Sequence, residues 1–239
     1  MKLTRFGALA ATAAIVLSAC GAAGSTAPSD PLGVVTIPAG EKIHIVDWGV
    51  LSGADASLGE DSLYGVQIAV DDKGGKLLGF DINLTTEDGL CTVDGGAAAA
   101  QKMASDNTIV GLIGSSCSDE TVGGIAALTN AGLTTISPSN TRPALTAPDR
   151  DATFAGYART AHSDAFQGKA VAEFVYNELK LTKAATIHDG SAYAEALQQV
   201  FADEFTALGG EIVIQEAVSK GQTDMKPVLT KVAAAKPEV

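Results

Sequence analysis

The sequence lacks the short motifs by which many enzymes hold metals, cofactors or activated nucleophiles. Its three histidines, His44, His162 and His188, are scattered without the spacing of metal ligands. No Gly-x-Gly-x-x-Gly segment follows an apolar strand, and Ser115 and Ser118 lie outside a Gly-x-Ser-x-Gly turn. We therefore expect a protein that is not an enzyme and that needs neither a metal nor a cofactor.

Basic residues are scarce. Lysine and arginine together number 16, against 28 aspartates and glutamates, and the formal net charge is −12. Such an excess of negative charge argues against nucleic acid or an anionic lipid surface as a partner. A small ligand remains compatible with it, because a helix N-terminus can bind an anion inside an acidic protein.

The apolar run at the N-terminus, Phe6–Leu17, is too short to cross a bilayer. It follows the basic residues Lys2 and Arg5, which is the arrangement of an export signal. The segment Leu17–Gly21 matches a bacterial lipobox, so residues 1–20 are predicted to be a lipoprotein signal peptide whose Cys20 becomes lipidated. An ordinary cleavable signal peptide with an incidental cysteine is the alternative.

Residues 21–42 contain glycine, alanine, serine and proline but no periodic apolar face. This composition cannot bury enough apolar surface to fold, and it predicts a flexible tether. Together with acyl chains on Cys20, the tether would hold the folded part outside the cytoplasm and attached to a bacterial membrane.

Apolar strands and amphipathic helices alternate along the rest of the chain. Strict alternation of this kind predicts an α/β protein with doubly wound parallel sheets. A new round begins after Arg159, and the chain stops at Lys236-Pro237-Glu238-Val239, a run that usually leads into another strand, so the second unit is predicted to be cut short. The expected strands are Ile43–Val50, Phe80–Thr86, Ile109–Gly114, Leu133–Ile136, Ala184–Ile187 and Ile212–Ala217, and the expected helices are Glu60–Asp72, Val93–Ala104, Val122–Asn130, Ala165–Leu179, Tyr193–Leu208 and Asp224–Ala234.

Two successive strands end in loops of small hydroxylated residues, at 115–121 and at 137–141. Loops of this kind at neighbouring strand ends are where open α/β sheets bind small molecules. The first loop opens a helix, whose unpaired N–H groups and partial positive charge can hold a carboxylate. The alternative is that these serines and threonines serve only as helix caps and turn formers.

Two cysteines remain besides Cys20. Cys91 and Cys117 each lie in a loop at the carboxyl end of a strand, and an oxidising compartment favours a disulfide between them. Such a bridge would brace the loop that carries Ser118. Two buried free thiols are the alternative.

Several segments together resemble one family. The chain is similar to extracytoplasmic solute-binding proteins of type I fold, specifically the branched-chain amino-acid binding family of ABC importers. The resemblance covers residues 43–239, and its motifs are Leu51-Ser52-Gly53, Asp88-Gly89-Leu90-Cys91, Ile113-Gly114-Ser115-Ser116-Cys117-Ser118, Ile136-Ser137-Pro138-Ser139-Asn140-Thr141, Arg159-Thr160 with Ser163-Asp164 and Gln167-Gly168, and Ile187-His188-Asp189 leading to Tyr193.

The resemblance implies two lobes, 43–160 and an incomplete 161–239, with a ligand cleft between them and a cysteine pair that matches Cys91 and Cys117. In the family, the ligand's carboxylate and ammonium are held by positions that match Ser118, the backbone around Ser139, and Thr141, while Tyr193 matches a residue that closes from the second lobe. The first hinge crossing is expected at Arg159, Thr160 and Asp164.

Two positions depart from the family pattern. Leu58 stands where well-known members carry an aromatic residue over the ligand side chain, and Asp47-Trp48 stand where apolar residues are usual. Leu58 and Trp48 are therefore expected to reshape the side-chain pocket.

These features predict a lipid-anchored protein that captures a small amino acid, with a branched-chain amino acid as the favoured ligand. It would deliver this ligand to the membrane subunits of an ABC permease by hinge closure. The alternative is a ligand-sensing receptor domain of the same fold, which would recognise amino acids or small amides. The lipobox favours the transport hypothesis.

Overall fold

The computed structural model describes residues 35–239. The predicted signal peptide, the lipidation site at Cys20 and most of the predicted tether lie outside the described residues. Within the described part of the chain, no helix is long and apolar enough to cross a membrane.

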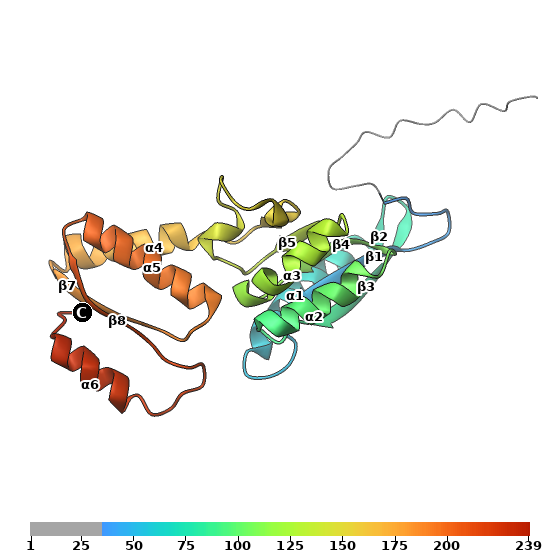
Figure 1. The fold of residues 1–239 in the computed structure, drawn as a ribbon. Helices are drawn as coiled ribbons and strands as arrows, with labels where there is room; N and C mark the ends of the chain where they lie inside the picture. The colour runs from blue at the N-terminus through green and yellow to red at the C-terminus, as the bar shows by residue number, and fades with distance from the viewer. Residues whose placement is uncertain (1–34) are drawn as a thin grey trace, which may run out of the picture.

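A six-stranded sheet forms the first lobe (Figure 1). All neighbouring strands are parallel except β2, which pairs antiparallel with β3. This confirms the predicted doubly wound parallel sheet. Across the sheet the strands are β2 (Lys76–Leu77), β3 (Phe80–Asp88), β1 (Ile43–Gly49), β4 (Ile109–Gly114), β5 (Thr135–Ser137) and β6 (Tyr157–Arg159).

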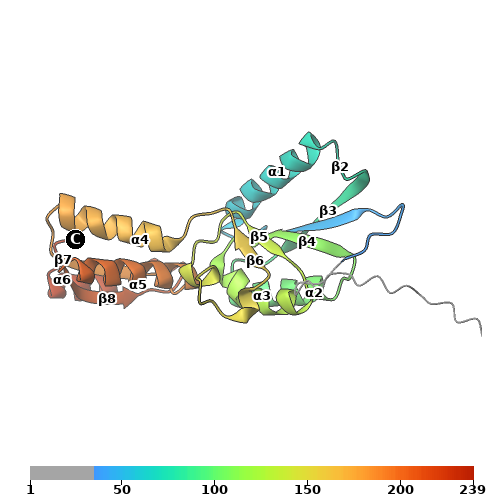
Figure 2. The same cartoon turned by 90° about the horizontal axis from the view of Figure 1, so that it is seen from above.

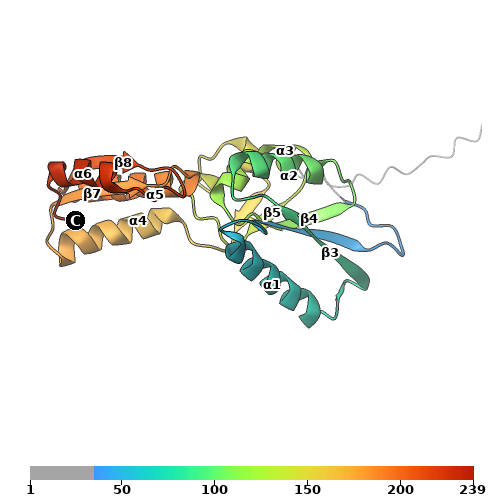
Figure 3. The same ribbon diagram turned by 90° about the horizontal axis from the view of Figure 1, so that it is seen from below.

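Helices cover both faces of this sheet (Figures 2 and 3). Helices α2 (Val93–Ala104) and α3 (Ser118–Asn130) pack together on one face and enclose the main hydrophobic core. Successive side chains of a strand point to opposite faces, so Val46 and Trp48 of β1 both enter this core. The buried core residues are Val46, Trp48, Ala99, Ala100, Met103, Ile109, Leu112, Ile125, Leu128, Leu133, Leu145 and Tyr157.

Helix α1 (Ala56–Asp72) lies on the opposite face and packs less closely. A groove of about 570 Å³ lies between α1 and the sheet. Val66 lines that groove half-buried, and Ala69 is exposed. At Gly59 the helix lies against Val50, the residue after β1, whose backbone a Cβ at position 59 would strike. The start of α1 is thereby fixed beside the carboxyl end of β1.

The second lobe is smaller. Its parallel strands β7 (Lys183–His188) and β8 (Glu211–Ala217) form a two-stranded sheet. Its main buried cluster consists of Ala172, Val175, Ala184 and Phe205. The helices of this lobe are α4 (Asp164–Glu173), which continues as a π-helical turn over Phe174–Glu178, α5 (Ala192–Ala207) and α6 (Lys226–Ala235).

The structure differs from the sequence-based expectations mainly at element ends. Helix α3 begins at Ser118 rather than Val122, because Cys117 occupies the cap position and Glu120 bonds back to its N–H. Strands β2 and β6 were not expected, since two or three residues carry too little periodicity to predict a strand.

Candidate functional site

A cavity of about 430 Å³ lies where the two lobes meet. The carboxyl ends of β1, β4 and β5 lead into its first-lobe wall, which is where open parallel sheets bind ligands. Five residues expected from the sequence to contact a ligand line this cavity: Leu58, Ser118, Ser139, Thr141 and Tyr193.

Trp48 does not line the cavity, and the expectation that it reshapes the side-chain pocket is wrong. Only 1% of Trp48 is exposed, and it belongs to the core between β1, α2 and α3. Its ring lies against Gly124 of α3, where a Cβ would crowd it. The alternation along β1 sends Trp48 to the same face as Val46, away from the cavity.

A buried carboxylate organises the loop that leads into α3. Glu120 is fully buried, and its Oε2 accepts hydrogen bonds from the N–H groups of Ser116 at 3.0 Å and Cys117 at 2.9 Å. Its Oε1 accepts a third from the Cys91 N–H at 3.0 Å. Burial raises the pKa of Glu120, and the three N–H donors oppose that rise by stabilising the charged form.

Sequence reasoning missed Glu120. The signal was the spacing from Cys117, because a glutamate three residues after a cap position is typical of a capping box. With cysteine in place of serine or threonine at the cap, the pattern is easy to overlook.

Cys91 and Cys117 form a disulfide with their Cα atoms 5.2 Å apart, which confirms the predicted bridge. Both cysteines line the cavity. The same two loops are thus joined twice, once by the disulfide and once through Glu120. This double connection holds Ser118, the first residue of α3, in a fixed place.

Three hydroxyl groups of the two loops, those of Ser115, Thr121 and Ser137, form hydrogen bonds within the loops. Asn140 Nδ2 donates to Ser115 Oγ at 3.1 Å and to Thr121 Oγ1 at 2.6 Å, and Ser137 Oγ donates to the Ser115 carbonyl at 2.7 Å. Ser115, Thr121 and Ser137 therefore have a structural role in these loops, as the alternative interpretation of the sequence expected. Ser118 differs, since its buried Oγ has no hydrogen-bond partner among the described residues.

The direction of the hydrogen bond made by the Thr141 hydroxyl is defined by its partner. Thr141 Oγ1 lies 2.9 Å from Asp164 Oδ2, and the Asp164 N–H donates to the Thr141 carbonyl at 2.9 Å. A deprotonated Asp164 can only accept, so Thr141 donates its proton to it and offers lone pairs to the cavity. Burial raises the pKa of Asp164, and the hydrogen bond from Thr141 opposes the rise.

The predicted hinge residues lie around the crossing between the lobes. Arg159 ends β6 and donates to the carbonyls of Asn140 at 3.1 Å and Arg142 at 2.9 Å, so it is held in the first lobe. The Thr160 N–H donates to the Ser137 carbonyl at 3.0 Å. The stretch 161–163 then leads to Asp164, where α4 begins.

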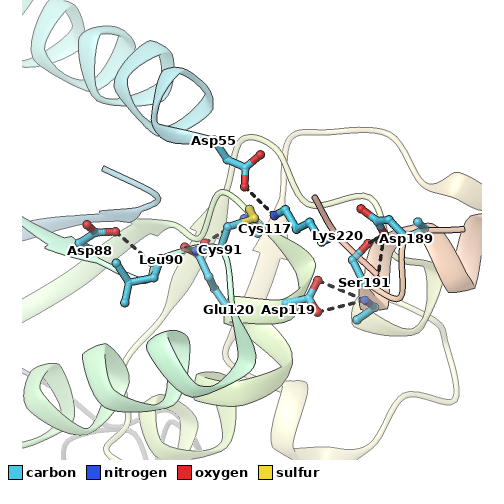
Figure 4. Close-up of polar contacts among 12 residues, drawn as sticks. Asp55, Asp88, Leu90, Cys91, Cys117, Asp119, Glu120, Asp189, Ser191 and Lys220 are labelled. Atoms are coloured by element: carbon cyan, nitrogen blue, oxygen red, sulfur yellow. Dashed lines mark hydrogen bonds and ion pairs between the residues drawn. A yellow bond between two sulfur atoms is a disulfide. The ribbon is translucent and has the colours of Figure 1, made fainter. Parts of the chain in front are cut away.

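The second lobe adds polar side chains to the cavity, and two of its contacts cross to the first lobe (Figure 4). The Ala192 N–H donates to Asp119, and Lys220 Nζ lies 2.5 Å from Asp55 Oδ2. Asp189 stays within its own lobe, where the Ser191 hydroxyl and N–H bond to it and lower its pKa.

Carboxylates outnumber cations along the cavity. Asp55, Asp119 and Asp189 line it, together with the single lysine Lys220. Negative lining of this kind favours a ligand that carries an ammonium group. Within residues 35–239, no group of three or more metal-ligating side chains could hold a metal ion.

Comparisons with known proteins agree with this architecture. A family described as "Periplasmic binding protein" matches residues 43–239. An amino acid binding protein of Pseudomonas aeruginosa is 28% identical over 193 residues, which cover 80% of this chain and 50% of that protein. The chain therefore spans about half the length of the curated relatives it matches.

Solved structures share the fold. A branched-chain amino acid transporter substrate-binding protein from Streptococcus pneumoniae, in complex with isoleucine, has a TM-score of 0.68 at 26% identity, covering 83% of this chain and 56% of that one. A solute-binding protein of an ABC transporter from R. palustris, in complex with benzoate, has a TM-score of 0.72 at 23% identity, covering 83% and 54%. The type I fold with an incomplete second lobe is confirmed, and the chain belongs to the periplasmic binding protein family.

Proposed function

We propose that this protein captures an amino acid outside the cytoplasm, preferably a branched-chain one, and delivers it to the membrane subunits of an ABC importer. The observation that carries the proposal is the pair of unlike polar groups in one cavity: Ser118 at a helix N-terminus and Thr141 backed by a carboxylate. These two groups complement the carboxylate and the ammonium of an amino acid.

The carboxylate end of the ligand would lie against the start of α3. Ser118 is the first residue of that helix, and its hydroxyl is free to donate among the described residues. The helix N-terminus contributes N–H donors and partial positive charge. The disulfide and Glu120 support the proposal, because they hold this helix end in place before a ligand arrives.

The ammonium end would lie against Thr141. Its hydroxyl proton is committed to Asp164, so its lone pairs are the groups that can receive an ammonium. The Ser139 backbone beside it and the acidic lining of the cavity would add to this preference. An aryl carboxylate such as benzoate has no ammonium to occupy this place.

The remaining wall supports an aliphatic side chain. Leu58 and Tyr193 line the cavity from opposite lobes, and both are partly exposed there, at 43% and 39%. A branched aliphatic group between them would bury apolar surface on both sides. A ligand that touches both lobes binds the closed form more tightly and so draws the lobes together.

Membrane attachment through Cys20 is part of the proposal, and it rests on the lipobox alone. The mature protein is expected to partition into detergent and to carry a diacylglycerol mass at its N-terminus, as measured by mass spectrometry. Cys20→Ala should give an unprocessed or soluble form. A native mature protein that starts elsewhere and is water-soluble would contradict the anchor.

Calorimetric titration with leucine, isoleucine, valine and benzoate tests the ligand. We expect the amino acids to bind and benzoate to bind more weakly, because benzoate leaves Thr141 without a donor. Ser118→Ala and Thr141→Ala should each weaken amino-acid binding by about 1 to 3 kcal/mol.

Ser62→Ala is a matched control, because the Ser62 hydroxyl bonds to the Leu58 carbonyl within α1 and lies outside this cavity. It should leave the affinity unchanged. Binding of benzoate with indifference to all amino acids would overturn the proposed ligand and favour an aromatic carboxylate.

A further inference from the structure

Asp119 of the first lobe makes a hydrogen-bonded contact with the second lobe. The Ala192 N–H lies 3.0 Å from Asp119 Oδ1 and 3.2 Å from Oδ2. The two residues are 73 positions apart in the sequence, and Figure 4 shows the contact as dashed lines that run from Asp119. Both oxygens of the carboxylate are directed at one backbone donor.

Two helix N-termini meet at this carboxylate. Asp119 lies in the first turn of α3, and Ala192 is the first residue of α5. Each helix N-terminus carries partial positive charge, so the two ends would repel each other if nothing lay between them. The Asp119 carboxylate, whose two oxygens are directed at α5, offsets this repulsion and thereby favours their approach.

Helix α5 is capped from two sources. Ser191 Oγ accepts the Ala194 N–H at 3.2 Å from within the second lobe. The Ala192 N–H, in contrast, finds its acceptor only in Asp119 among the described residues. The cap of α5 is therefore completed only when the lobes are together.

Tyr193 directly follows Ala192, and it is the second-lobe residue that the proposed function places over the ligand. Ser118 directly precedes Asp119 on the other side of the contact. The contact therefore sets the position of Tyr193 relative to Ser118. A shift of α5 that broke it would also carry Tyr193 out of the cavity wall.

Lys220 and Asp55 provide a second connection between the lobes. Their side chains are 49% and 38% exposed, and ion pairs at such positions contribute little to stability. Asp119 makes the stronger of the two contacts, because a charged acceptor and two helix ends act together. The Lys220–Asp55 pair is a secondary connection.

We propose that Asp119 is a positioning residue of the binding site, which caps α5 from across the cavity and so holds Tyr193 over Ser118. The proposal rests on the proposed function for the role of Tyr193. It also assigns the ligand carboxylate to one place: Asp119 occupies the N-terminus of α5, so the N-terminus of α3 is the helix end available to the ligand.

The test uses the whole chain with 3-fluorotyrosine in place of its four tyrosines, observed by fluorine NMR without added ligand. The Tyr193 resonance is assigned by its loss in Tyr193→Phe. In Asp119→Ala it should move toward the position of a solvent-exposed fluorotyrosine, with the ratio of open to closed molecules raised about tenfold or more. The resonances of Tyr64, Tyr157 and Tyr176 should stay in place.

Asp119→Asn keeps one acceptor oxygen and should shift the Tyr193 resonance only part of the way. Asp94→Ala is the matched control, since Asp94 occupies the first turn of α2 within the first lobe. An Asp119→Ala protein that retains its folded tyrosine resonances and leaves Tyr193 unmoved would overturn the proposal. Because no ligand is added, failure of the proposed ligand would not affect this result.

Discussion

The main buried cluster of the first lobe has twelve residues under a six-stranded sheet, whereas that of the second lobe has four beside a two-stranded sheet. The same contrast holds in the cavity between them. First-lobe loops are joined by a disulfide, by Glu120 and by the Asn140 network, while the second lobe brings Tyr193 on the first turn of a single helix. We infer that the first lobe holds a preformed ligand site and the second lobe supplies closure.

The largest effect on stability is expected from truncating a buried side chain in the core of the second lobe. Phe205 is fully buried there and packs on Phe201 and Tyr176. Phe205→Ala should cost about 3 to 5 kcal/mol. With so few other core residues, we expect hydrogen exchange to show the second lobe unfolding while the first stays protected.

Phe166→Ala provides the control, because Phe166 is 74% exposed in the same lobe. It should change the free energy of unfolding little. Simultaneous loss of protection in both lobes of Phe205→Ala would show that they fold as one unit, against the contrast drawn above.

Removing the disulfide tests the preformed site. The bridge spans 26 residues, and the chain-entropy estimate for a loop of that length is about 3 kcal/mol. The double variant Cys91→Ser with Cys117→Ser should lose this stability in urea unfolding and show faster amide exchange at Ser118. A reducing agent should produce the same loss in the original protein and none in the variant.

The buried carboxyl group of Asp47 makes the stability of the first lobe depend on pH. It is 2% exposed in β1, and burial raises its pKa from 3.8 to about 6. The folded protein binds this proton more tightly than the unfolded chain does, so stability falls as the pH rises from about 4 through 6. By pH 7 the loss is about 3 kcal/mol.

Asp47→Asn should therefore stabilise the protein at pH 7 and flatten the dependence of unfolding free energy on pH between 4 and 7. Asp61→Asn, an exposed change on α1, is the control. An unchanged pH profile in Asp47→Asn would show that Asp47 is not the responsible group.

The sequence predicted the fold well because long apolar runs carry a clear period. Six of the eight strands were predicted, and the two that were missed, β2 and β6, have two or three residues each. Helix starts were placed too late at α1 and α3, and at α3 a capping contact from Glu120 extends the helix beyond the amphipathic segment. Local periodicity cannot show such contacts.

The site was predicted in part. Leu58, Ser118, Ser139, Thr141 and Tyr193 all line the cavity, and their ligand contacts stay a prediction. Trp48 was misplaced although its spacing from Val46 already indicated the opposite face. The contacts of Glu120 and Asp119 join segments 29 and 73 residues apart, so they depend on tertiary structure that the local sequence does not reveal.

The central claim, a site preformed by the first lobe and closed by the second, can be tested by mapping amide chemical shifts during leucine titration of two variants. In Tyr193→Ala, leucine should still perturb the amides of Ser139 and Thr141, with affinity weakened toward the millimolar range. In Ser118→Ala, the same perturbations should require about 5- to 150-fold more leucine than in the unchanged protein. The opposite order, in which Tyr193→Ala abolishes the perturbations and Ser118→Ala leaves them intact, would contradict the account.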